Sequence, residues 1–120
     1  MCIQLRSFKC EPATLRCGLN DVTFIITYNN PDHPGQRING LIESTRPEDP
    51  YRFVLNTGSE VAAKEFQHTL QAGQGEIRIP AQLKITAGNC DGRGRIQFGV
   101  EYRLGPGASH CQGRVTLIRF

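Results

Sequence analysis

The sequence has no tryptophan, a single methionine and only three histidines. Its longest uncharged apolar stretch, residues 22–28, is about a third of the roughly 20 residues that a helix needs to cross a bilayer, so we expect no membrane span. Residues 1–10 carry Arg6 and Lys9 where a secretory signal would need an unbroken apolar run. We therefore expect no targeting peptide.

Common catalytic and nucleotide-binding motifs are also missing. The chain has no Gly-Lys-Ser/Thr phosphate loop, no Gly-x-Gly-x-x-Gly, no His-Glu-x-x-His, no Gly-x-Ser-x-Gly and no Cys-x-x-Cys. The closest cysteines, Cys10 and Cys17, enclose six residues, whereas structural zinc sites pair ligands about two to four residues apart. The sequence therefore predicts no cofactor and no metal, although catalytic residues can still converge from distant strands.

The amino-acid composition of residues 1–120 is typical of one globular domain. Hydrophobic residues make up 38% and charged residues 21%, enough for a single core without cross-links. The net charge of +3 arises from the second half, where residues 61–120 have eight Lys+Arg against four Asp+Glu, and residues 1–60 have six against seven. A nucleic-acid-binding protein would have a denser basic face, so we expect no nucleic-acid partner.

Alternation of apolar and polar residues is clearest in residues 95–104. Every second residue there is apolar: Ile96, Phe98, Val100, Tyr102 and Leu104. A period of two predicts a half-buried strand in an antiparallel sheet. Turn residues flank it at 91–92 and at 105–107, and a strand over 114–120 would return beside it to form a terminal hairpin.

Other segments rich in β-branched and aromatic residues predict further strands. These are residues 2–8, 22–28, 38–44, 51–56 and 76–86. Residues 22–28 are the best candidate for a central strand. The alternation assigns Tyr28, Tyr51 and Tyr102 to inward positions, away from any ligand. Pro80 interrupts the last segment and indicates an edge position, a bulge or a crossing between sheets.

Residues 59–72 allow two interpretations. As a helix, the segment has a capping Ser59 and a terminating Gly73. As a strand, it has alternating apolar residues from Phe66 to Ala72 that lead through a glycine turn into residues 76–80. We expect a helical turn over 59–64, followed by a strand that forms a hairpin with 76–80.

The strand count and spacing predict an all-β fold, a two-layer antiparallel β-sandwich that is immunoglobulin-like or jelly-roll-like, with a closed barrel as the next choice. A short helix near residues 59–70 is the one departure expected. An immunoglobulin domain usually has a core tryptophan between two cysteines, and this chain has no tryptophan. We therefore predict the architecture alone, because no motif is specific enough to name a family.

The five cysteines leave at least one free thiol in an oxidised monomer. A Cys10–Cys17 disulfide is the most plausible local bridge, whereas Cys90 and Cys111 should lie near opposite ends of the 95–104 strand and remain unbonded to each other. The simpler alternative is that each cysteine is a buried apolar side chain. Without a leader or a glycosylation sequon we expect a reducing, cytoplasmic compartment, although a piece of a secreted protein would look the same.

Two loops contain candidate interaction residues. Arg93 and Arg95 alternate with glycines, an arrangement in which backbone N–H groups and guanidinium groups can approach an anion. The simpler interpretation is a turn with solvated arginines. Asp32 and His33 lie in a proline-rich loop, where they could bind a cation or perform acid–base chemistry, but a loop histidine is more often solvated.

These observations favour a non-catalytic domain that recognises a protein partner through loops or a strand edge, alone or within a larger protein. One alternative is a structural subunit, such as a coat or appendage protein, that self-assembles through strand edges. Another is a small enzyme or toxin-like effector with a loop-built Cys, His and Arg site. Catalysis would require a concave pocket that holds two or more of Asp32, His33, His68, His110 or a thiol.

Overall fold

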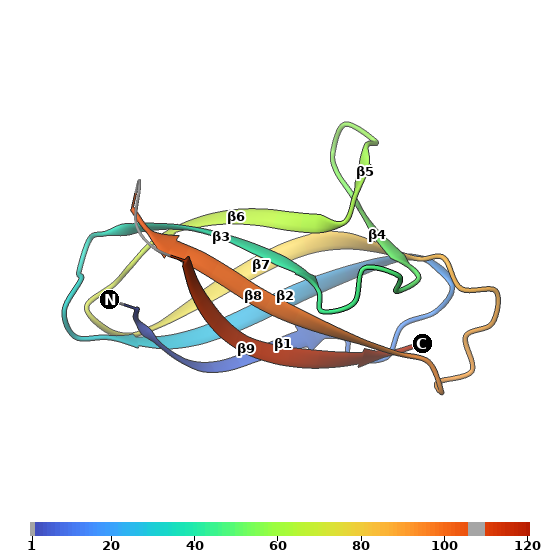
Figure 1. Ribbon diagram of the computed structural model, residues 1–120, viewed down its shortest axis with the longest axis horizontal. Helices are drawn as coiled ribbons and strands as arrows, with labels where there is room; N and C mark the ends of the chain where they lie inside the picture. Colours follow the sequence, from blue (N-terminus) through green and yellow to red (C-terminus); the bar gives the residue numbers. More distant parts are fainter. Residues whose placement is uncertain (1, 106–109) are drawn as a thin grey trace.

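Two antiparallel sheets pack face to face in the computed structural model, which describes residues 2–105 and 110–120 (Figure 1). One sheet has the order β1-β2-β7-β4-β5 and the other β6-β3-β8-β9. The predicted all-β sandwich is therefore confirmed. The strands are β1 (Gln4–Glu11), β2 (Gly18–Asn30), β3 (Arg37–Ser44), β4 (Tyr51–Val54), β5 (Glu60–Val61), β6 (Ala63–Thr69), β7 (Gly73–Ile85), β8 (Arg95–Leu104) and β9 (His110–Arg119).

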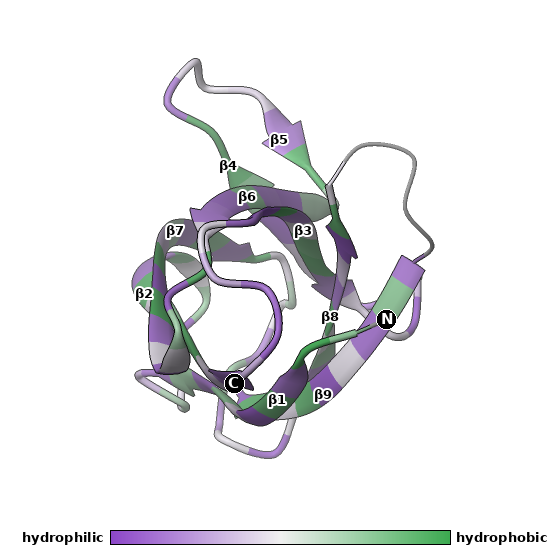
Figure 2. Ribbon diagram, turned by 90° about the vertical axis from the view of Figure 1, so that its left-hand side faces the viewer, coloured by the Kyte–Doolittle hydropathy of each residue, from purple (hydrophilic) through white to green (hydrophobic). Residues whose placement is uncertain are grey.

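The two sheets meet along two long edges, which we call seams, and the seams differ in their hydrogen bonding. Along one seam β1 and β9 lie side by side (Figure 2). In the segment just after β1, Leu15 N donates to Arg119 O at 2.7 Å and Arg119 N donates to Ala13 O at 2.9 Å. Along the other seam β6 pairs only with β3, and β7 pairs with β4 only over Gln82–Ile85. The sandwich is consequently closed by hydrogen bonds on one side and open on the other.

The core forms where the inward rows of both sheets meet. Phe24, Phe53 and Phe98 come from three strands and are fully buried, with ring centroids 5.6–6.0 Å apart. Tyr28 and Tyr51 are buried too, as is Tyr102, so their predicted inward orientation is confirmed.

β2 lies between β1 and β7, as predicted for the central strand. Ile25 faces outward from β2 yet is only 1% exposed. Its cross-strand neighbours are Lys9 and Arg78, both long charged residues. Their aliphatic stems account for this burial, because such side chains can cover apolar surface while the charged ends stay in water.

The expectations for Pro80 in β7 and for the terminal hairpin are confirmed. Pro80 lies in the part of β7 that pairs with β2 alone, so it occupies an edge position on its other side. β8 and β9 form the predicted hairpin, with β9 beginning at His110 rather than at 114. The predicted turn residues Pro106 and Gly107 lie outside the described residues.

The prediction for residues 59–72 was wrong in two respects. No helix occurs in the described residues, and hence none that is long and apolar enough to cross a membrane. β5 replaces the predicted helical turn. The predicted strand that follows does form, as β6, but it pairs with β3 rather than with residues 76–80. The reason is packing: Phe66 lies opposite Gly40, and a Cβ atom at Gly40 would lie 2.3 Å from the Phe66 ring. The missing side chain of Gly40 provides the space for this ring.

The Cys10–Cys17 prediction was also wrong. The disulfides are Cys2–Cys111 and Cys17–Cys90, with Cα atoms 5.8 and 5.6 Å apart. Cys10 is free because it points into the core, where it is 3% exposed and its thiol donates to Pro12 O at 3.5 Å. Cys90 and Cys111 are not bonded to each other, as expected.

Candidate functional site

The outward face of the β6-β3-β8-β9 sheet carries charged, amide, imidazole and apolar side chains. Strand register arranges its side chains in rows that cross the sheet. We call this surface the outer face. From one end to the other its rows are Gln67-Asn39-Arg103-His110, Glu65-Leu41-Glu101-Gln112, Ala63-Glu43-Gly99-Val115 and, on β8 and β9 alone, Gln97-Leu117 and Arg95-Arg119.

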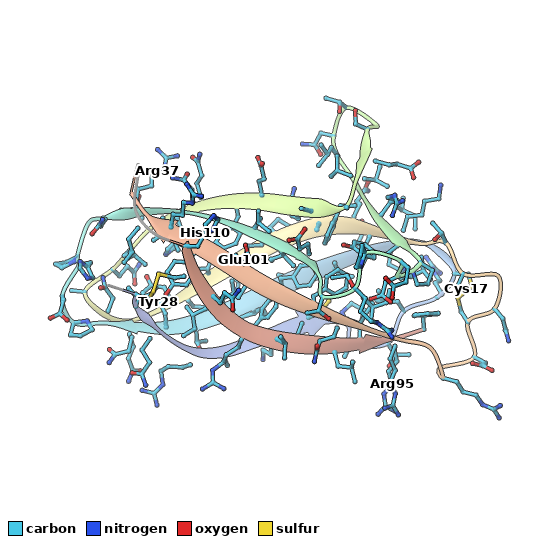
Figure 3. The ribbon with its side chains drawn as sticks, in the orientation of Figure 1. Cys17, Tyr28, Arg37, Arg95, Glu101 and His110 are labelled. Atoms are coloured by element: carbon cyan, nitrogen blue, oxygen red, sulfur yellow. A yellow bond between two sulfur atoms is a disulfide. The ribbon has the colours of Figure 1, made fainter. Side chains whose placement is uncertain are left out.

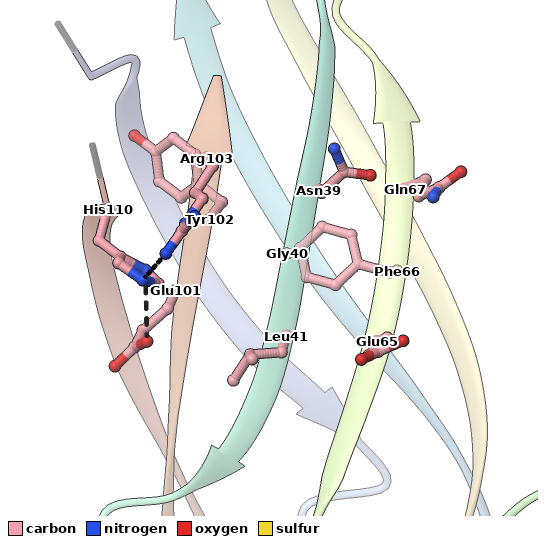
Figure 4. A pocket seen from close by; sticks show the side chains of 10 residues that line it. All are labelled: Asn39, Gly40, Leu41, Glu65, Phe66, Gln67, Glu101, Tyr102, Arg103 and His110. Atoms are coloured by element: carbon pink, nitrogen blue, oxygen red, sulfur yellow. Dashed lines mark hydrogen bonds and ion pairs between the residues drawn. The ribbon is translucent and has the colours of Figure 1, made fainter. Parts of the chain in front are cut away.

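A hollow of about 350 Å³ opens on the first two rows (Figure 4). The Arg103 guanidinium group donates a hydrogen bond to His110 Nε2, and Glu101 Oε2 lies 3.9 Å from His110 Nδ1. Because arginine can only donate, Nε2 must accept and the imidazole proton sits on Nδ1, facing Glu101. The hollow thus presents a guanidinium, an imidazole and a carboxylate to a polar ligand or chain. Among the described residues that line it, none is a serine, threonine, cysteine or lysine that could act as a nucleophile.

Next to this hollow lies an exposed apolar patch formed by Val115 and Leu117. Their exposed fractions are 49% and 42%, and both point outward from β9. A second hollow, of about 290 Å³, separates Val115 from Glu43 across Gly99. The outer face therefore combines two exposed aliphatic side chains with concave, polar surroundings.

A β-bulge in β9 shapes this surface. The register between β8 and β9 shifts between Gly99 and Glu101, so that Gly113 and Arg114 together oppose one residue of β8. A Cβ atom at Gly113 would lie 2.3 Å from Leu5 Cδ1, and Arg114 Nε donates to Leu5 O at 2.9 Å. The bulge is therefore the point at which β1 approaches β9, and the sequence contains no alternation signal that could have located it.

Arg93 and Arg95 lie at one end of the sandwich, beside the Cys17–Cys90 disulfide, and Arg95 points into solvent (Figure 3). Gly92 N and Gly94 N both donate to Phe120 O, at 2.9 and 3.0 Å, and Arg93 N donates to Asp91 Oδ1 at 3.1 Å. The backbone donors that an anion would need are consequently occupied. This geometry matches the simpler interpretation, a turn with solvated arginines.

Asp32 and His33 lie in the β2–β3 loop, at the opposite end of a molecule 46 Å long (Figure 1). His33 N donates to Asn30 Oδ1 at 3.0 Å, and Asn30 Nδ2 donates to Gln71 O at 3.0 Å. Asn30 is fully buried and holds the loop in place. Its position just before Pro31 was the available sequence signal for this turn. The structure therefore does not bring Asp32 and His33 together with Arg93 and Arg95.

The other candidates for acid–base or thiol chemistry are also separated. His68 Nε2 lies 3.1 Å from Tyr28 Oη, and burial lowers the pKa of this imidazole. Burial and the neighbouring Glu11 carboxylate raise the pKa of the Cys10 thiol from 9.0 to about 12, so it is not a thiolate nucleophile near neutral pH. Within the described residues no group of three His, Cys, Asp or Glu side chains could hold a metal ion.

Comparisons with known proteins give a similarity of fold. No protein-family profile matches the sequence, and no curated protein matches it. Among solved structures, the chain is similar to the alkylpurine DNA glycosylase AlkC of Pseudomonas fluorescens bound to DNA containing an abasic site analog. The TM-score is 0.54 and the identity 17%, over 98% of this chain and 30% of the glycosylase chain. At this identity the similarity concerns the sandwich fold alone.

Proposed function

We propose that this chain is a non-catalytic recognition domain that binds a protein partner through the outer face, with the patch of Val115 and Leu117 at the centre of contact. The observation that carries the proposal is the exposure of these two side chains, 49% and 42%, on one strand face beside two hollows. Exposed apolar residues rimmed by polar ones are typical of protein interfaces.

The surroundings of the patch fit that role. Glu43 and Glu101 lie on one side of it and Arg95 and Arg119 on the other. A protein interface usually has an apolar centre and a polar rim, in which charges select the partner and set its orientation. The partner that fits this face would place an apolar side chain between Val115 and Leu117, with basic groups towards the glutamates and acidic groups towards the arginines.

The strand order supports an immunoglobulin-like assignment within the proposal. In immunoglobulin constant domains the sheets have the orders ABED and CFG. The orders β1-β2-β7-β4 and β3-β8-β9 correspond to these two sheets, and β5 and β6 are additions beside β4 and β3. Immunoglobulin-like sandwiches commonly serve as recognition modules in larger proteins, and the similarity to 30% of a longer chain is compatible with that arrangement.

The test is photo-crosslinking followed by binding measurements. A photoreactive residue at position 117 should capture a specific protein from the source cells, and the same residue at exposed Leu19 on β2 should not. With that protein purified, Val115→Asp and Leu117→Asp should each weaken binding by about tenfold or more. Leu19→Asp is the matched control, because Leu19 is 46% exposed on the other sheet. Equal affinity of all three variants would contradict the proposal.

A further inference from the structure

The open seam of the sandwich leaves one edge of β6 without a partner strand. β6 pairs with β3 across seven residues, from Ala63 to Thr69. No other backbone hydrogen bond involves these residues in the described part of the chain. An unpaired edge presents main-chain donors and acceptors that an extended polypeptide can use.

The inward side chains of β6 are only half-buried, unlike those of its neighbour. Lys64, Phe66 and His68 are all partly exposed, whereas Ile38 and Ile42, their partners on β3, are at most 1% exposed. Solvent therefore reaches beneath the edge of β6. The aromatic ring of Phe66 would lose this exposure if another strand were added there.

We propose that β6 pairs antiparallel with β6 of a second copy of this chain, in a register centred on Phe66. A two-fold axis perpendicular to the sheet keeps equivalent side chains on the same face, so the two half-buried phenylalanine rings would cover each other. The result would be a continuous eight-stranded sheet made from two four-stranded ones.

The charged residues of β6 meet uncharged partners in this register. Glu65 of one copy lies opposite Gln67 of the other, twice, so that each carboxylate has an amide donor as its neighbour. Ala63 lies opposite Thr69. Lys64 lies opposite His68, which is neutral near pH 7 because burial lowers its pKa. No like charges face each other at that pH.

The free edge of β6 borders an open groove at its first residues. A groove of about 510 Å³ runs beside the first residues of β6, lined mainly by Leu55, Val61, Ala62 and Ala63. In the proposed register the Thr69 end of the second copy enters this groove and covers its apolar lining. Lys64 opposes a tight association, because an inward lysine on an edge strand must keep its ammonium group in water. We therefore expect a weak dimer that forms at high concentration.

Two substitutions at one position test the register. Gln67→Glu would place a carboxylate opposite Glu65 at two symmetric points and should weaken the dimer by about 2- to 30-fold, whereas Gln67→Lys should strengthen it by a similar factor. Gln67 is exposed, faces uncharged Asn39 and accepts a hydrogen bond from Arg37 within its own chain. Urea denaturation of each variant at a concentration where the protein is monomeric therefore controls for changes within the monomer. Sedimentation velocity over a range of concentrations measures the dissociation constant of the dimer.

Cysteine cross-linking gives an independent readout. A mixture of Glu65→Cys and Gln67→Cys variants should form disulfide-linked heterodimers, because these positions oppose each other, while each variant alone should form few. A monomer at every concentration, or a dimer insensitive to both Gln67 substitutions, would overturn the proposal. Either result leaves the outer-face proposal intact, since Val115 and Leu117 lie on β9, at the other edge of the sheet.

Discussion

At the scale of single residues, the roles of Gly40, Gly113 and Cys10 are set by the side chains packed against them. Gly40 makes room for the Phe66 ring, and Gly113 makes room for Leu5 and Val100. At both positions, a side chain from another strand occupies the space that a Cβ atom would need. Cys10 is an ordinary core residue, since its raised pKa keeps it protonated. These roles depend on neighbours that are distant in the sequence.

Gly40→Ala should destabilise the protein by about 1–3 kcal/mol, the usual cost of overpacking. The added Cβ would lie 2.3 Å from one Phe66 ring atom and 3.0 Å from Glu101 O, so a backbone as well as a ring must move. The measurement is the free energy of unfolding from chemical denaturation. Gly88→Ala is the control, because a Cβ there meets nothing within 4 Å. Equal stability of the two variants would show that Phe66 moves freely.

At the scale of elements, β8 and β9 place two arginines directly opposite each other. Arg95 pairs with Arg119 in the register, both are exposed, and neither has an acidic partner within 4 Å in the described residues. Like charges in such cross-strand pairs are destabilising. The terminal hairpin therefore retains a repulsive pair that a protein selected only for stability would lack, which agrees with a role for this end of the outer face in binding.

Arg119→Glu should raise the free energy of unfolding by about 0.2–1 kcal/mol, because it replaces the repulsion with an ion pair to Arg95. Arg6→Glu makes the same change of net charge at an exposed position outside the β1–β2 register, and serves as the control. Thermal and urea denaturation at low salt measure the difference. A gain in the Arg6 variant as large as in the Arg119 variant would assign the effect to net charge instead.

At the scale of the whole molecule, the two disulfides tie the sandwich together at opposite ends. Cys2–Cys111 joins the segment before β1 to β9, and Cys17–Cys90 joins the segment before β2 to the loop before β8. Cross-links of such long sequence separation, 109 and 73 residues, restrict the unfolded chain strongly. Disulfides are typical of oxidising compartments, whereas the sequence led us to expect a reducing one, and the compartment itself stays a prediction.

Alkaline pH should weaken the whole fold. Burial raises the pKa of Cys10 to about 12, and burial likewise raises the pKa values of Tyr51 and Tyr102 above 10.0. The unfolded state therefore releases protons first as pH rises. Stability from these groups is complete below pH 9, the ordinary pKa of the thiol, and is lost as pH increases towards 12. Each group contributes a slope of at most about 1.4 kcal/mol per pH unit.

Urea denaturation between neutral and alkaline pH, without reductant, measures this loss. Cys10→Ala should have a shallower pH dependence than the unchanged protein, although its stability at neutral pH is lower. Tyr102 should contribute as well, because its hydroxyl donates to Ile3 O at 2.9 Å and ionisation would remove that donor. An unchanged free energy up to pH 11 would contradict these pKa directions.

Local chemistry was enough to predict most of the strands and their inward faces, but not β5. Alternation with a period of two is a property of neighbouring residues, and it identified β8, the central β2 and the burial of all three tyrosines. The terminal hairpin was predictable for the same reason, since its strands are adjacent in the chain. The glycine-rich turn that contains Arg93 is likewise a local feature of the sequence.

The choice of partners required the folded molecule. β6 pairs with β3 because Phe66 fits over Gly40, and the cysteines pair across 109 and 73 residues because the fold brings those segments together. The outer face arises in the same way, from rows assembled across four strands. Periodicity along a strand states which way a side chain points, but it carries no information about which strand lies beside it, and that second property depends on how distant side chains fill space.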